Sequence, residues 1–271
     1  MQYKARYIDG VASEPSLAML FGHTVHTALE TLLQGHRQTC LVCHEANSDH
    51  LDCARQRYWQ EFDQMRATLR ELEVEASSNL YLEGLRMIDQ VGELKLNSDS
   101  CSKAERSIRI PTSWAGLDWP VVGAVDLWSP PWSRHGAVIF DFKTTAGGWG
   151  EARCQRERWQ PLLYTWAYLR AYDVVPTFKY IVLNRIDGGL TLFERSWKSR
   201  SAWWEDFENL QFSAEEIAEA VRDGNFACAK RHGSCLECGE PFGHEHVCRT
   251  PARKRVQLTG KANGSIEATA V

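Results

Sequence analysis

Two charged residues, Asp141 and Lys143, interrupt the apolar run Ala137-Val138-Ile139-Phe140-Asp141-Phe142-Lys143-Thr144-Thr145. Side chains alternate along a strand, so the acid and the lysine share one face while Phe140 and Phe142 share the other. A polar group on a buried strand is unfavourable unless it is paired or binds a metal ion. The pair therefore predicts a working site; the alternative is an edge strand with an Asp–Lys pair on its surface.

A second acid, Asp126, lies in the otherwise apolar run Gly123-Ala124-Val125-Asp126-Leu127-Trp128-Ser129. If this run pairs with the next strand through the turn from Pro130 to Gly136, the carboxylates of Asp126 and Asp141 converge at one end of a sheet. Two adjacent carboxylates repel each other unless a cation neutralises them, and hard oxygen ligands suit Mg²⁺ or Mn²⁺. Lys143 would stand beside that metal, where an ammonium can orient an attacking water or stabilise charge on a phosphate.

Two helical patterns supply further candidates. Gly22, His26 and Glu30 are four residues apart, so they share one helix face. A glycine inside a helix costs up to about 1 kcal/mol relative to alanine, which predicts a close approach at Gly22. His26 would complete the metal coordination; the alternative is an ordinary helical histidine. On a later helix Gln160 and Tyr164 share a face and would hold a phosphate or a base beside the metal.

The C-terminal cysteines have the spacing C-x6-C-x2-C-x9-C, formed by Cys228, Cys235, Cys238 and Cys248. Four thiols around a CxxC centre favour a metal site over free thiols in a reducing compartment. Three histidines in the same segment, His232, His244 and His246, would suit zinc.

A second group of cysteines, Cys40, Cys43 and Cys53, repeats the C-x2-C-x9-C spacing, with His44 and His50 nearby. These residues would form a small zinc knuckle. The alternative is a flexible polar insertion over residues 36–56 whose cysteines do nothing together.

Hydrophobic periodicity and turn residues position these candidates on a series of elements. Helices are expected over residues 14–34, 57–90, 154–172, 201–210 and 213–223, and strands over 104–110, 119–128, 136–144, 177–186 and 190–196. The expected domains are a main domain over 1–225, a four-cysteine module over 226–250 and a disordered tail over 251–271.

Composition limits the classes of function. The chain has 271 residues, nine cysteines and a formal net charge of −4, so a nucleic-acid contact requires a local basic patch. No export signal or membrane span is recognised, which predicts a cytoplasmic protein without membrane contact and argues against a disulfide framework. Two basic clusters are candidates for the patch, with Trp149 and Trp159 available to stack on unpaired bases: Arg153, Arg156 and Arg158; and Arg249, Arg253, Lys254 and Arg255.

The order GxxxHxxxE, GxxD, D-x-K in an apolar strand and QxxxY on a helix resembles the RecB-like branch of the PD-(D/E)XK nuclease superfamily. The resemblance runs from Gly22 to Tyr164. It implies an α/β fold, a central mixed β-sheet flanked by helices with a restriction-endonuclease-like core, and divalent-metal hydrolysis of DNA. By resemblance His26, Asp126 and Asp141 match the metal ligands, Lys143 the catalytic lysine, and Gln160 and Tyr164 the accessory motif. Glu30 and Glu105 are supporting candidates.

The resemblance also bears on the C-terminal cysteines. Several RecB-like nucleases carry a four-cysteine [4Fe-4S] cluster with one ligand before the helical histidine, and this chain has no cysteine before His26. Either Cys228 is the fourth ligand or the module holds zinc. A zinc hydrolase centred on these cysteines is disfavoured, because four thiolates leave no open coordination position.

The sequence thus predicts a Mg²⁺- or Mn²⁺-dependent deoxyribonuclease, an exonuclease or an endonuclease, in DNA repair, recombination or phage DNA processing. A helicase or a recombination protein is an expected partner besides DNA. The alternative is an inactive nuclease-fold adaptor that binds DNA through its cysteine module, and the intact Asp126, Asp141 and Lys143 argue against it.

Overall fold

The computed structural model of the chain describes residues 14–33, 50–74, 77–96, 103–110, 120–147 and 149–223. It divides into two compact units. The larger, called the sheet unit here, comprises residues 16–110 and 122–208. The other comprises residues 1–15, 111–121 and 209–271, of which the described part is mainly the end of helix α6 (Arg200–Arg222).

Five strands form one mixed sheet in the order β1 (Lys103–Ile110), β2 (Val121–Ser129), β3 (Val138–Thr145), β4 (Thr177–Asn184) and β5 (Leu190–Arg195). The β2–β3 and β4–β5 pairs are antiparallel and the β3–β4 pair is parallel. All five strands match the sequence prediction to within two residues at each end. The predicted mixed sheet flanked by helices is confirmed.

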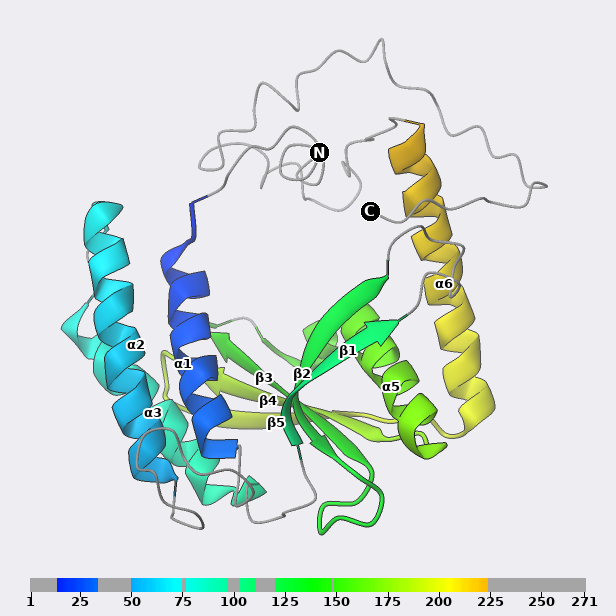
Figure 1. Cartoon of the computed structure of the whole chain (residues 1–271), viewed down its shortest axis with the longest axis horizontal. Coiled ribbons are helices and arrows are strands. Elements are labelled where there is room, and N and C mark those ends of the chain that lie inside the picture. Colours follow the sequence, from blue (N-terminus) through cyan, green and yellow to red (C-terminus); the bar gives the residue numbers. More distant parts are fainter. Residues whose placement is uncertain are drawn as a thin grey trace. The chain divides into compact units, whose positions relative to one another are not determined.

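Helices cover both faces of the sheet (Figure 1). On one face α1 (Leu17–Leu33), α2 (Leu51–Glu71) and α3 (Ser78–Glu93) pack on a core that includes Phe140 and Phe142 of β3. On the other face α5 (Trp159–Tyr172) packs on a core that includes Ile139 of the same strand, and the short α4 (Glu151–Arg156) precedes it. The alternation along β3 therefore sends neighbouring residues into separate cores.

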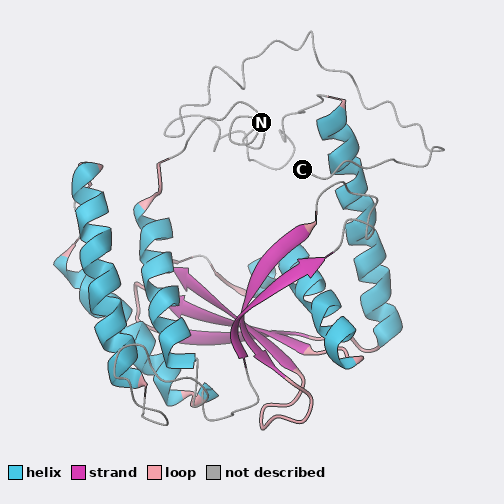
Figure 2. Cartoon of the chain, in the orientation of Figure 1, coloured by secondary structure: helices cyan, strands magenta, loops and turns pink. Residues whose placement is uncertain are grey.

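The helix expected over residues 57–90 is wrong as a single element, because α2 and α3 are separate (Figure 2). Glu73 has a left-handed backbone with φ of 57°, and Ser77 caps α3 by accepting the Asn79 N–H at 3.2 Å. The loop expected over 36–56 is also wrong at its end: α2 begins at Leu51, so Cys53 lies in a helix and is buried. Cys40 and Cys43 lie outside the described residues, so the zinc knuckle stays a prediction.

Two further helix predictions need correction. The helix expected over 154–172 is divided, because Glu157 ends α4 with an extended backbone and α5 starts at Trp159. The helices expected over 201–210 and 213–223 are one continuous helix, α6, since residues 211 and 212 contain no helix breaker.

In the described ranges no helix is both long enough and apolar enough to cross a membrane. The four-cysteine module, the tail and the basic cluster around Arg253 lie outside the described residues.

Candidate active site

The sheet opens between β2 and β3 at Asp126. The register between the two strands runs from Ser129 opposite Val138 to Leu127 opposite Phe140. At the next position the Asp126 carboxylate oxygen Oδ2 accepts the backbone N–H of Phe142 at 2.7 Å. A side-chain oxygen thus satisfies a β3 donor where the backbone pairing ends, and it fixes the carboxylate beside β3.

Asp141 and Lys143 share the face of β3 that α5 covers, as predicted from their spacing. Asp141 is 2% exposed, and its Oδ2 lies 2.6 Å from Lys143 Nζ. This contact is an ion pair without the angles of a good hydrogen bond, since Oδ2 has no hydrogen-bond donor among the described residues. Lys143 Nζ also lies 5.9 Å from the centre of the Tyr180 ring, on the parallel neighbour β4.

Burial and neighbouring charges shift the proton affinities of the site. Burial raises the pKa of Asp141 to about 7, against the opposing effect of Lys143, and the charge of Asp126 adds to the rise. Burial would lower the pKa of His26, but the hydrogen bond and charge of Asp126, helped by Asp141, outweigh it and raise that pKa. Without a bound metal ion, Asp141 and His26 therefore bind protons more tightly than the same side chains do in water.

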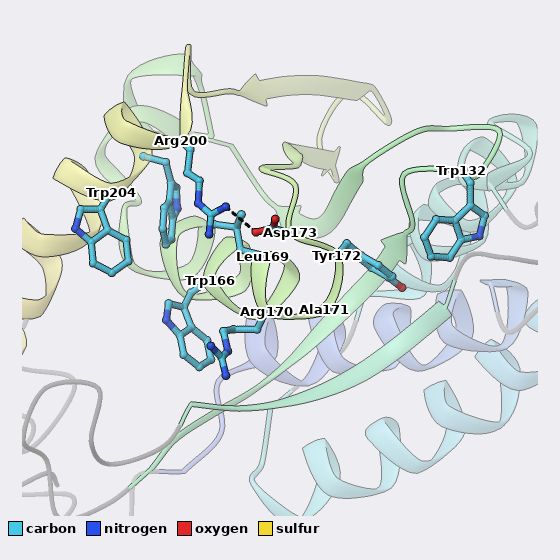
Figure 3. Close-up of a pocket in the computed structure, with 10 residues that line it drawn as sticks. Trp132, Trp166, Leu169, Arg170, Ala171, Tyr172, Asp173, Arg200 and Trp204 are labelled. Carbon is cyan, nitrogen blue, oxygen red and sulfur yellow. Dashed lines mark hydrogen bonds and ion pairs between the residues drawn. The ribbon is translucent and has the colours of Figure 1, made fainter.

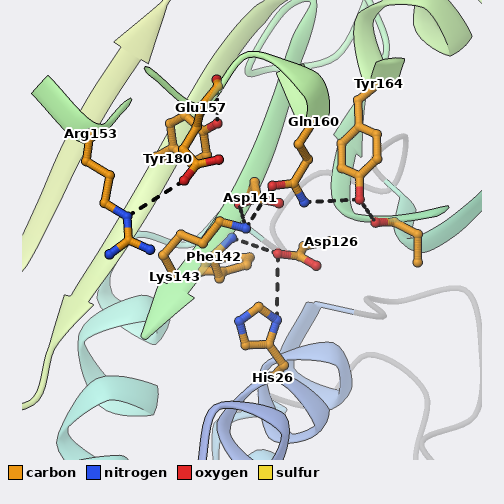
Figure 4. Close-up of polar contacts among 11 residues, drawn as sticks. His26, Asp126, Asp141, Phe142, Lys143, Arg153, Glu157, Gln160, Tyr164 and Tyr180 are labelled. Carbon is orange, nitrogen blue, oxygen red and sulfur yellow. Dashed lines mark hydrogen bonds and ion pairs between the residues drawn. The ribbon is translucent and has the colours of Figure 1, made fainter. Parts of the chain in front are cut away.

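A hydrogen-bonded chain connects Lys143 through α5 to β2 (Figure 4). Lys143 Nζ donates to Gln160 Oε1 at 2.9 Å, and Gln160 Nε2 donates to the Tyr164 hydroxyl at 3.1 Å. That hydroxyl donates in turn to the Ala124 carbonyl. Gln160 therefore orients the lysine, and Tyr164 braces α5 against the strand that carries Asp126. A direct role of either residue in holding phosphate stays a prediction.

His26 approaches from the opposite helical layer. Its Nδ1 lies 3.7 Å from Asp126 Oδ2, and its ring stands edge-on to Phe142 at 6.4 Å between centroids. One turn earlier, a Cβ added to Gly22 would lie 3.0 Å from Thr144 Oγ1 at the end of β3. The close approach predicted at Gly22 is confirmed, and it brings α1 near enough for His26 to reach Asp126.

Among the described residues, the contacts of the predicted metal ligands are pairwise, and they do not surround one common metal site. His26 contacts Asp126, whereas Asp141 contacts Lys143. Within the described ranges no group of three His, Cys, Asp or Glu side chains is arranged to hold a metal ion. Glu30 is half-buried one turn beyond His26, and Glu105 lies in β1. The roles of all these residues as ligands or supporting acids stay predictions.

Sequence reasoning missed Tyr180 and Thr144, whose positions depend on pairing across the sheet and between layers. No motif in the sequence around Tyr180 or Thr144 indicates that either residue lies near the site. Among the basic residues expected to meet nucleic acid, Arg153 lies 4.9 Å from the centre of the Trp149 ring and 3.7 Å from Glu157. Trp149 in turn lies 5.1 Å from Tyr180, so this aromatic and basic group adjoins Lys143.

Comparison with known proteins agrees with this geometry. The family model of the PD-(D/E)XK nuclease superfamily matches residues 1–249. The structure of a presumed exonuclease from Eubacterium rectale matches 86% of this chain and 78% of its own at 10% identity, with a TM-score of 0.53. At that identity the likeness concerns the fold alone.

Two comparisons contribute less. The structure of SSO0001 matches 68% of this chain and 75% of its own at 14% identity, but its TM-score of 0.30 carries no argument. No relative was found among curated proteins. Because the family model spans nearly the whole chain and the sheet carries Asp126, Asp141 and Lys143 together, the chain belongs to the PD-(D/E)XK nuclease superfamily.

Proposed function

We propose that the protein is a metal-dependent deoxyribonuclease of the RecB-like branch that hydrolyses phosphodiester bonds. The observation that carries the proposal is the adjacency of Asp126, Asp141 and Lys143 at the point where β2 and β3 separate. Burying two carboxylates and an ammonium together lowers the stability of the fold, because the charges lose their hydration. The same charges can stabilise the charge that develops on a phosphate during hydrolysis.

The carboxylates suit a hard divalent cation. Asp141 Oδ2 is buried, carries no hydrogen bond among the described residues and has the ammonium of Lys143 as its counter-charge. Mg²⁺ or Mn²⁺ held by Asp126 and Asp141, with His26 as a further ligand, would replace that counter-charge. When bound, the metal would lower the pKa of an attacking water and stabilise the leaving oxygen.

The chain's own residues would then act on the phosphate. Lys143, released from Asp141, would direct its ammonium toward the phosphate oxygens, while Gln160 Oε1 limits the positions that the ammonium can take. The face of the Tyr180 ring, 5.9 Å from Lys143 Nζ, would attract the ammonium and help to hold it in place.

DNA is the proposed substrate, attacked either from strand ends or within a strand. A function in repair, recombination or phage DNA processing, with a helicase or recombination protein as partner and a cytoplasmic location, belongs to the same proposal. So does the domain plan: a nuclease domain over 1–225, a module in which Cys228, Cys235, Cys238 and Cys248 bind zinc or an iron–sulfur cluster, and a tail.

The test is cleavage of end-labelled linear and covalently closed circular DNA by the whole protein in Mg²⁺, Mn²⁺ or EDTA. We expect cleavage with either metal, none in EDTA, and loss of activity in Asp141→Asn. Asp63→Asn on the exposed side of α2 is the matched control and should cleave like the parent. Cleavage of linear DNA alone identifies an exonuclease, and cleavage of both an endonuclease.

An Asp141→Asn protein that cleaves as fast as the parent would contradict the assignment. Metal-independent DNA binding without any cleavage by the parent would instead support the adaptor, in which the cysteine module does the work.

A further inference from the structure

A tryptophan-lined pocket lies at the C-terminal end of α5 and the start of α6, within the sheet unit (Figure 3). Its volume is about 640 Å³, and four of the chain's eleven tryptophans line it: Trp132, Trp166, Trp203 and Trp204. The predicted active site uses none of them. This pocket, called the tryptophan pocket below, is therefore a separate feature that needs its own explanation.

Two of these rings are exposed and held in place. Trp132 is 70% exposed and stands edge-on to Tyr172 at 5.3 Å. Trp204 is 47% exposed, and its indole N–H donates to Glu208 at 2.7 Å. Large aromatic surfaces left in water mark binding sites, and rings that are already oriented lose little entropy when a ligand stacks on them.

The charges at the pocket favour an anion. The guanidinium of Arg170 lies 5.9 Å from the centre of the Trp166 ring. Asp173, which also lines the pocket, is neutralised by Arg200 at 2.6 Å. A flat aromatic surface beside an arginine binds a base and its phosphate together.

Helix α5 connects the pocket to the candidate active site. Trp159, Leu163, Trp166 and Arg170 recur at helical spacing and form one partly exposed stripe. Gln160, which contacts Lys143, lies in the first turn of that helix, ten residues before Arg170. At 1.5 Å per residue the pocket is about 15 Å along the axis from Gln160, a length spanned by roughly four stacked nucleotides of one strand.

We propose that the tryptophan pocket binds unpaired bases of a DNA strand a few nucleotides from the bond that is cut. This rests on the proposed nuclease function and specifies its substrate as single-stranded or end-frayed DNA. Indole rings need the faces of bases, which are covered in a duplex. One strand fits this surface better than two.

The experiment measures fluorescence anisotropy of a labelled 16-nucleotide oligo-dT and of a labelled 16-base-pair duplex with the full chain in EDTA, so that binding is separated from cleavage. The variants are Trp132→Ala and Trp204→Ala. Trp59→Ala is the matched control, because Trp59 is 57% exposed on α2, away from the pocket. We expect each pocket variant to weaken single-strand binding about five- to hundredfold, since stacking is worth that much per base, with little change for the duplex or for Trp59→Ala.

A second substitution tests the charge without removing a ring. Arg170→Gln should lower the slope of log affinity against log salt by about one phosphate contact, whereas Arg66→Gln on α2 should leave the slope unchanged. Equal single-strand affinity of the parent and both tryptophan variants overturns the proposal. So does equal weakening for single strand and duplex, or an effect on self-association in sedimentation without an effect on DNA.

The binding assay also separates this proposal from the proposed function. Pocket variants that bind like the parent, while Asp141→Asn abolishes cleavage, reject the pocket and leave the nuclease. Weakened binding in the pocket variants, with unchanged cleavage in Asp141→Asn, rejects the catalytic assignment and leaves the pocket.

Discussion

The ammonium of Lys143 occupies the side of Asp141 where a metal ion would supply the same positive charge. At 2.6 Å from the carboxylate it neutralises a side chain that is almost completely buried. Removing the ammonium alone would leave the Asp141 carboxylate buried without its counter-charge. A metal ion bound as proposed would therefore compete with Lys143 for the Asp141 carboxylate.

This competition gives a prediction for Lys143→Met. Without the ammonium, Asp141 has lost its resident cation, so Mn²⁺ should bind more tightly, by about tenfold for ~1.4 kcal/mol of lost competition, while cleavage is abolished. Titration calorimetry with Mn²⁺ measures the affinity. Lys179→Met is the control, since Lys179 is of similar exposure and pairs with Glu194 on β5. Weaker Mn²⁺ binding in Lys143→Met would show that the two cations do not compete.

The raised pKa values of Asp141 and His26 give a prediction for pH. Burial and neighbouring charges make Asp141 and His26 hold protons more tightly in the folded state, so these two groups bind more protons in the folded protein than in the unfolded chain. For Asp141 the interval runs from its ordinary value of 3.8 to about 7. The free energy of unfolding without metal should therefore fall as pH rises through this interval, by at most about 1.4 kcal/mol per unit for each proton.

Denaturant unfolding in EDTA at pH 5, 6 and 7 measures this slope, and the Asp141→Asn variant should flatten it. A stability that rises with pH in the parent, or a slope unchanged in the variant, would rule out Asp141 as the source.

At the scale of elements, the site depends on how closely α1 approaches the end of β3. Gly22 faces Thr144, where an added Cβ would lie 3.0 Å from the Thr144 Oγ1, and His26 lies one turn further along the same helix. The glycine therefore sets the distance from the imidazole to Asp126. Gly123 has a similar position in β2, where an added Cβ would lie 3.2 Å from the Tyr164 ring.

Gly22→Ala should reduce cleavage while leaving stability unchanged or raised. Alanine favours the helix by up to about 1 kcal/mol, but a shift of α1 by a few tenths of an ångström would reduce the rate about tenfold. Cleavage kinetics and thermal unfolding measure the two effects. Thr144→Ala in the same chain should restore part of the activity, because it removes the contacting Oγ1.

Gly92→Ala controls for the loss of a helical glycine, since its Cβ would meet only the flexible end of Leu51 at 3.1 Å. A Gly22→Ala protein with parental activity would show that the close approach does not position His26.

The strands were predictable from sequence and the helix ends were not. Polar residues at single positions in apolar runs, such as Asp126 and Asp141, identify both the strand and its working face. The break at Glu73 had no such mark, because a glutamate with φ of 57° is held by its surroundings rather than by its own preference. Ser77, a cap residue, and Pro161, near the start of α5, were usable signals for two helix starts.

The residues of the candidate site could be predicted from the sequence, but the contacts between them could not. Spacing grouped Asp141 with Lys143 and Gln160 with Tyr164, and each pair shares a face in the structure. The hydrogen bond from Lys143 to Gln160, and the ring of Tyr180 behind the lysine, depend on which strand and helix become neighbours. Those contacts follow from the tertiary fold, which no local pattern contains.

At the scale of the whole molecule, the C-terminal cysteines give a further prediction. Thiolate ligands at Cys228, Cys235, Cys238 and Cys248 would contribute folding free energy directly. Cys235→Ser should therefore lower the melting temperature or the yield while the metal-dependent cleavage rate of the folded fraction persists. Cys154→Ser, at a buried thiol beside α5, is the control for loss of a cysteine.

Metal analysis of protein purified without oxygen separates the two candidate metals. Brown protein with absorbance near 400 nm indicates an iron–sulfur cluster, and colourless protein with one zinc per chain indicates a zinc site. Protein with neither metal and four freely titratable thiols would remove the module from the proposal.

The hydrogen-bonded chain of the site has a consequence for the order in which the molecule folds. Lys143 and Gln160 are 17 residues apart along the chain, whereas His26 and Asp126 are separated by 100. Contacts between near residues close small loops and form early, and distant ones form late. The lysine and its glutamine would therefore meet while α1 is still unattached, and the imidazole would arrive last. Pulse-labelled hydrogen exchange, with protection of β3 and α5 amides preceding that of α1, would record this sequence of events; simultaneous protection would refute it.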